Sequence, residues 1–102
     1  MKRFEVRFTP EAETDLLRLF EFVAATDLSS AERAYQAIVK AIDVLEVFPF
    51  SCRKAPGGSG SAMVRELIIP FGDAGYVALF EIEPVSMVTV LAIRHQREHD
   101  FT

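Results

Sequence analysis

The chain has 102 residues, of which 50% are hydrophobic and 25% charged, with a net charge of −4 and a single cysteine. This length fits one domain, residues 1–102, that is large enough to bury a core. No apolar run reaches the ~20 residues of a membrane helix, and one cysteine cannot form an internal disulfide. We therefore expect a cytoplasmic protein that does not enter a membrane.

The acidic residues are concentrated in one part of the chain. Residues 10–49 carry eight acids against three bases. A protein that grips nucleic acid over a broad surface usually carries a basic stripe or patch. This chain can offer only local basic clusters.

The first predicted element is a strand near the N-terminus. Phe4, Val6 and Phe8 alternate with the charged residues Glu5 and Arg7. Alternation with a period of two is typical of a strand that buries one face. It is also unlike the continuous apolar core of a signal peptide.

A helix is predicted to follow directly. Thr9 suits the cap, Pro10 suits the first helical position, and Glu11 favours the positive end of the helix dipole. The apolar residues that recur at helical spacing, and so predict one buried face, are Ala12, Leu16, Leu19, Phe20 and Val23. Leu17 and Phe22 lie off this stripe and are available to a second surface.

A second helix is predicted after a short break. Ser29 and Glu32 have the spacing of a capping box, and Phe48–Pro49 ends the pattern because proline disfavours helical geometry in the residue before it. The buried stripe consists of Ala34, Ile38, Ile42 and Leu45. Two antiparallel helices joined by a short turn are the expected result.

Three strands are predicted in the last third of the chain. A flexible loop with Gly57, Gly58 and Gly60 precedes them. The strands are expected at residues 64–69, 76–83 and 87–93, where apolar and β-branched residues dominate. The predicted fold class is α+β: an N-terminal strand, an antiparallel helix hairpin, and a four-stranded, mainly antiparallel sheet on which the hairpin packs.

This order of elements and several local phrases resemble the RelE/ParE superfamily of bacterial toxins, the plasmid stabilisation proteins. The phrases are F-T-P-E-A-E-T-D-L at 8–16, A-I-D-V-L-E-V-F-P at 41–49, V-R-E-L-I-I-P-F at 64–71, G-Y-V-A-L-F-E-I at 75–82 and V-L-A-I-R-H at 90–95. Together they span almost the whole chain. The phrases R-E-L-I-I-P and I-R-H-Q-R-E are more similar to the ParE side.

The resemblance implies the toxin of a type II toxin–antitoxin module, with a cognate antitoxin as partner. ParE-like members poison DNA gyrase, whereas RelE-like members cleave mRNA on the ribosome. The antitoxin is expected to cover apolar grooves along the helix pair or the sheet edge. No cofactor or metal is expected, and the assembly is either a homodimer or a toxin–antitoxin hetero-oligomer.

RNA cleavage without a metal needs a base, an acid and cations around one phosphate. For this alternative the expected catalytic residues are Arg65, Arg94 and His95, with the two arginines close together in space. For target binding under either mechanism, the candidate residues are Arg53, Arg65, Phe71, Tyr76, Arg94, His95, Arg97 and Phe101. A structural reading is also open, in which Arg65 pairs with a carboxylate such as Glu66 or Glu81.

The C-terminus favours gyrase binding over RNA cleavage. The resemblance implies that RNA-cleaving relatives often carry Tyr or His near the end as a proton-transfer group, whereas this chain ends Asp100-Phe101-Thr102. His95 and His99 are then the side chains that titrate near neutrality. We predict a ParE-like toxin that binds DNA gyrase; a ribosome-dependent endoribonuclease and a non-toxic interaction module of the same fold remain alternatives.

Overall fold

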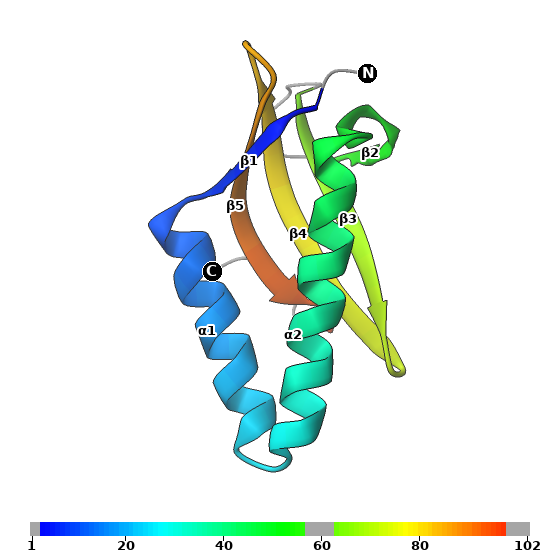
Figure 1. The fold of residues 1–102 in the computed structure, drawn as a ribbon. Helices are drawn as coiled ribbons and strands as arrows, with labels where there is room; N and C mark the ends of the chain where they lie inside the picture. Colours follow the sequence, from blue (N-terminus) through cyan, green and yellow to red (C-terminus); the bar gives the residue numbers. More distant parts are fainter. Residues whose placement is uncertain (1–2, 57–62, 98–102) are drawn as a thin grey trace.

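The fold is an α+β arrangement, as predicted. The computed structural model describes residues 3–56 and 63–97 (Figure 1). In chain order the elements are β1 (Glu5–Phe8), α1 (Pro10–Ala24), α2 (Leu28–Ile42), the 3₁₀ helices η1 (Asp43–Glu46) and η2 (Pro49–Ser51), β2 (Arg53–Lys54), β3 (Val64–Phe71), β4 (Ala74–Glu83) and β5 (Met87–His95). The predicted sequence of strand, helix hairpin and three further strands is confirmed.

The strands form one mixed sheet with the order β1-β5-β4-β3-β2. β1 runs parallel to β5, and the other neighbours are antiparallel. The sheet has five strands where four were expected, because the two residues of β2 pair with Glu66 and Arg65 of β3. A two-residue strand has too few positions to show a period of two in the sequence.

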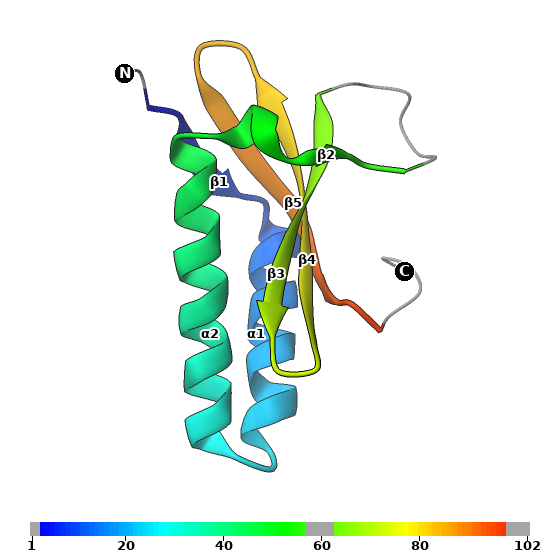
Figure 2. The ribbon, with the colours of Figure 1, turned by 90° about the vertical axis from the view of Figure 1, so that its right-hand side faces the viewer.

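Both helices lie on one side of the sheet (Figures 1 and 2). We call the two surfaces of the sheet the helix face and the helix-free face. Because side chains alternate along a strand, Phe80 of β4 points to the helix face and its neighbour Leu79 to the other. The buried cluster between sheet and helices comprises Ala12, Leu19, Ala34, Ile38, Ile42, Leu45, Ile69, Tyr76, Ala78, Phe80, Ile82, Val88, Val90 and Ile93.

The start of α1 is built as predicted and also joins the helix to the sheet. The Thr9 hydroxyl accepts a hydrogen bond from the Ala12 N–H and donates one to the Leu91 carbonyl. One turn later, the Asp15 carboxylate accepts from the Ile93 N–H at 3.0 Å. Asp15 therefore satisfies a backbone donor of β5 beyond the last residue that pairs with β1.

The start of α2 differs from the prediction. Asp27 is the N-cap, and its carboxylate accepts from both the N–H and the hydroxyl of Ser30. The predicted cap, Ser29, lies inside the helix, where its hydroxyl accepts from Arg33. Because the Asp27 carboxylate accepts from the Ser30 N–H, the helix starts two residues before the position that a Ser29 cap would set.

The end of α2 also differs from the expected stop at Phe48–Pro49. The α-helix ends at Ile42, and the chain tightens into η1 before reaching Phe48. The predicted glycine loop lies outside the described residues. None of the helices within residues 3–56 and 63–97 combines the length and the apolar character needed to cross a bilayer.

Candidate functional site

Arg65 lies on the helix face, next to Phe80 of β4. Its guanidinium donates hydrogen bonds to the carbonyls of Phe50 and Cys52, at 3.1 and 2.8 Å. The same group sits over the Phe50 ring, 5.4 Å from its centroid. Arg65 thus connects η2 and the start of β2 to the sheet.

Arg94 lies on the opposite side of the sheet from Arg65. Arg94 is paired with Val77 of β4, three positions from Phe80, and an odd separation along a strand places two side chains on different faces. The expectation that Arg65 and Arg94 lie close together is therefore wrong. Arg65 was correctly predicted to lie on a strand and Arg94 at the end of one. The face to which each side chain points depends on the register between the strands, which the sequence alone does not reveal.

His95 is on the helix face but at the far end of the sheet from Arg65. His95 pairs with Tyr76 of β4, which in turn pairs with Ile69 of β3. Ile69 is four positions from Arg65 along β3, so His95 and Arg65 are separated by about 13 Å along the strand direction at the usual rise of a strand. The His95 ring meets Tyr76 edge-on with centroids 5.6 Å apart, and its Nδ1 accepts from the Arg97 N–H. The three expected catalytic residues do not form one cluster.

Two of the expected aromatic contacts lie at this end of the sheet. Tyr76 is only 3% exposed and lies in the core, and burial raises the pKa of its hydroxyl. Phe71 is half-buried and packs against Tyr76, with ring centroids 6.4 Å apart. The placement of Tyr76 speaks against direct contact with a target, whereas Arg97 is exposed. Phe101 and His99 lie outside the described residues.

The helix-free face carries arginines that are already matched by carboxylates. Arg53 contacts Glu66 through both Nη2 and Nε, at 2.8 and 3.0 Å, and Glu66 is only 3% exposed. Arg7 donates to Glu83 at 3.1 Å and to the Thr89 hydroxyl at 2.9 Å. These ion pairs reduce the positive charge that this face could present to a phosphate.

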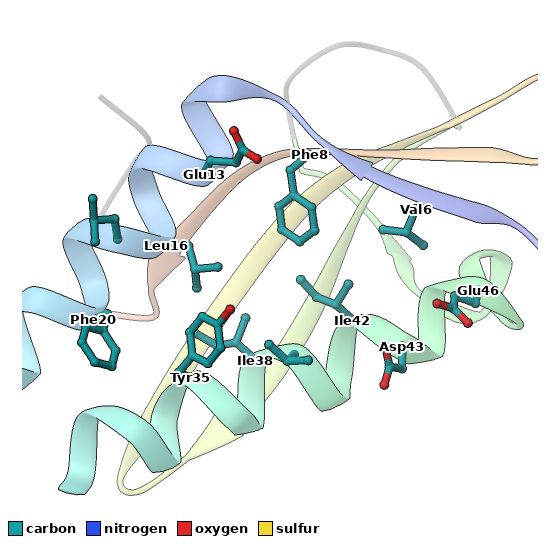
Figure 3. A pocket seen from close by; sticks show the side chains of 12 residues that line it. Val6, Phe8, Glu13, Leu16, Phe20, Tyr35, Ile38, Ile42, Asp43 and Glu46 are labelled. Atoms are coloured by element: carbon teal, nitrogen blue, oxygen red, sulfur yellow. The ribbon is translucent and has the colours of Figure 1, made fainter. Parts of the chain in front are cut away.

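A large apolar groove lies between the two helices and β1 (Figure 3). Its volume is about 740 Å³. The lining residues are Val6, Phe8, Glu13, Leu16, Leu17, Phe20, Tyr35, Ile38, Val39, Ile42, Asp43 and Glu46. Leu17 and Val39 are 57% and 38% exposed, so apolar surface faces solvent along both helices. Such a preformed apolar concavity is a candidate docking site.

The sequence contained one signal for this groove. Leu17 lies off the predicted buried stripe of α1, and the groove is the second surface that it lines. Val39 was not singled out, although it lies off the buried stripe of α2 just as Leu17 lies off that of α1. Among the described residues, no group of three or more His, Cys, Asp and Glu side chains is placed to hold a metal ion.

The fold and the groove define a small α+β protein with an apolar groove between its two helices and β1. Residues 6–100 match the model of the family described as the ParE toxin of the type II toxin–antitoxin system parDE. The chain belongs to this family. This confirms the predicted RelE/ParE superfamily and the prediction that the protein is the toxin of a type II toxin–antitoxin system.

Two of the solved structures with the same fold are from toxin–antitoxin systems. A chain of the chromosomal ParDE system from P. aeruginosa is 22% identical, with a TM-score of 0.70 over 90% of this chain and 95% of that one. A chain of the toxin–antitoxin complex RelBE2 from Mycobacterium tuberculosis is 23% identical, with a TM-score of 0.66 over 96% and 97%. At these identities the likeness concerns the fold alone. No match was found among curated proteins.

Proposed function

We propose that this protein is a ParE-like toxin that acts by binding DNA gyrase and is neutralised by a cognate antitoxin. The family match carries the toxin assignment. The separation of Arg65, Arg94 and His95 over both faces and both ends of the sheet supports binding over catalysis. Cleavage of RNA would need proton-transfer groups and cations converging on one phosphate.

The helix-free face supports the same choice. A ribosome-bound mRNA presents a dense array of phosphates, and docking to it favours uncompensated Lys and Arg. Here Arg53 and Arg7 are held by Glu66 and Glu83. The remaining candidates for target contact are Phe71, Arg94, His95, Arg97 and Phe101; Arg53 and Arg65 contribute mainly through the structure that they hold.

The groove between α1, α2 and β1 is the proposed antitoxin site. It is the surface where exposed apolar side chains of both helices converge, and burial of such surface is the main driving force of association. The relatives of the same fold come from toxin–antitoxin systems, which is consistent with a partner of this kind. An antitoxin seated here would leave the helix-free face uncovered.

Induced expression in a bacterial host, with separate readouts for DNA breaks and for mRNA cuts, tests the target. We expect growth arrest with trapped gyrase–DNA cleavage complexes and an unchanged pattern of mRNA ends by primer extension. Cuts at ribosome-bound codons without DNA breaks would replace the proposal with the endoribonuclease alternative. Normal growth at full expression would favour a non-toxic interaction module.

A matched pair of leucines tests the antitoxin site. Leu17 in the groove and Leu28 outside it are 57% and 58% exposed. Leu17→Gln should weaken binding of the protein encoded by the neighbouring reading frame about tenfold, because burying one leucine contributes roughly 1.5–3 kcal/mol. Leu28→Gln should leave the affinity within a factor of two. Equal affinities for the two variants would place the antitoxin elsewhere.

A further inference from the structure

Charge is distributed unevenly along the groove. Its three acidic side chains, Glu13, Asp43 and Glu46, are all at the end near β1 (Figure 3). Glu13 is in the first turn of α1, directly after β1, and η1 follows the C-terminus of α2. The other end, toward the α1–α2 turn, is closed by the aromatic pair Phe20 and Tyr35, whose centroids are 6.2 Å apart. The groove therefore has an acidic end and an aromatic end.

The acidic end is only partly neutralised by the protein itself. Glu46 pairs with Arg3 at 3.0 Å, and the Arg3 side chain is 73% exposed. Among residues 3–56 and 63–97, neither Glu13 nor Asp43 forms a salt bridge or side-chain hydrogen bond. Two carboxylates flanking apolar surface are best matched by cations on whatever covers that surface.

The shape of the groove favours a helix as the occupant. Its α2 side runs from Tyr35 to Glu46, about 18 Å at the rise per residue of α and 3₁₀ helices, which is the length of slightly more than three α-helical turns. Addition of a strand to β1 is less favourable, because the Phe4 N–H already bonds to the Glu46 carbonyl at 2.8 Å and the strand has four residues. An apolar groove between helices suits an amphipathic helix with anchors at i, i+3 or i+4, and i+7.

We propose that the antitoxin segment in this groove is a short amphipathic helix of about three turns, with Lys or Arg at the end that lies against β1 and apolar residues toward the α1–α2 turn. The inference rests on the proposed function, since it describes the chemistry of the partner at that site. It goes further by stating the sign and position of the partner's charge. Three of the eight acids in residues 10–49 thus become a recognition feature.

Two charge-matched double variants test the position of the charge. Glu13→Gln/Asp43→Asn removes two carboxylates at the β1 end, and Glu21→Gln/Glu32→Gln removes two at the opposite end, outside the groove lining. The probe is a labelled synthetic helix of three turns, with leucine anchors on one face and two lysines at one terminus. In low salt the first variant should bind it about fivefold more weakly and the second within twofold, since exposed ion pairs contribute little each.

High salt should remove the difference between the two variants, because it screens exposed charges. A peptide with glutamates in place of the lysines should bind the wild-type protein more weakly, and a peptide with a central proline should not bind. Equal losses for the two double variants, or equal affinity of the proline peptide, would overturn the proposal. The second result would point to an extended segment.

Failure of this inference is distinguishable from failure of the proposed function. If Leu17→Gln weakens antitoxin binding while both double variants bind the lysine peptide like the wild type, the groove is the site but the charge assignment is wrong. If the lysine peptide behaves as expected while Leu17→Gln leaves antitoxin binding unchanged, the groove chemistry stands and the proposed antitoxin site fails.

Discussion

At the scale of single residues, arginine in this protein acts mainly by joining segments. Arg65 supplies two charge-assisted hydrogen bonds, one to the Phe50 carbonyl within the 3₁₀ helix η2 and one to the Cys52 carbonyl directly after it. Replacing Arg65 by Ala should lower the free energy of unfolding by about 1–2 kcal/mol, because bonds to a charged donor contribute more than neutral ones. Urea denaturation measures the loss.

Two further variants decide the mechanism of that loss. Arg65→Lys keeps the charge but not the forked geometry, and it should recover only part of the stability. Arg97→Ala removes an exposed arginine and should change the stability by no more than about 0.5 kcal/mol. If Arg65→Ala were as stable as Arg97→Ala, the contacts with Phe50 and Cys52 would carry no weight in folding.

The Glu83 carboxylate makes the folding stability of the protein depend on pH. Its pKa is lowered by the hydrogen bond from the Thr89 hydroxyl and further by Arg7, against a smaller opposing effect of burial. A carboxylate whose folded-state pKa is depressed stabilises above its unfolded pKa, and the contribution is lost as the pH falls through the folded value. Thermal melting between pH 7 and pH 3 should therefore show a smaller decrease for Glu83→Gln than for the wild type. Glu81→Gln, a neighbour on the same strand and face, is the control for the loss of one negative charge.

At the scale of elements, the first residue of α2 depends on competition between two caps. Asp27 and Ser29 are both suitable by type, and the Ser29–Glu32 spacing favours the later start. The structure starts the helix earlier because the Asp27 carboxylate engages Ser30 through two hydrogen bonds. Asp27→Ala should therefore lower the melting temperature clearly more than Ser29→Ala. The pKa of Asp27 is lowered, chiefly by the Ser30 side chain, so the difference should shrink as the pH falls through that pKa. Equal effects of the two substitutions at neutral pH would restore Ser29 as the cap.

The elements that could be predicted are those with a strong local signal. Thr9–Pro10 and the alternation of Phe4, Val6 and Phe8 are decided by neighbours in the sequence, and both appear as expected. β2 and the link between Asp15 and Ile93 depend on segments brought together only by the fold. Long-range pairing of short segments leaves no periodic trace in the chain.

At the scale of the whole molecule, the parity of the strand register decides what kind of site can form. Arg65 and Arg94 are both on regular strands, and a shift of one position in the pairing would have put them on one face. The bulge at Leu79 and Phe80 illustrates how such parity changes: Leu79 pairs with Ala92, but Phe80 pairs with Val90. The strand positions of Arg65 and Arg94 were therefore predictable from the sequence, but the faces to which their side chains point were not.

Because Arg65 and Arg94 lie on opposite faces of the sheet, a double-mutant cycle at these two residues has a quantitative expected outcome. Arg65 donates to the carbonyls of Phe50 and Cys52, whereas Arg94, on the other face of the sheet, donates to the His95 carbonyl. Changes in unfolding free energy of distant sites without shared partners add to within about 0.5 kcal/mol, so the double variant should lose the sum of the two single losses within that limit. Urea denaturation of the wild type, both single variants and the double variant completes the cycle. A coupling energy above about 1 kcal/mol, typical of residues in one network, would mean that the two guanidinium groups cooperate across the sheet and would reopen the shared phosphate site.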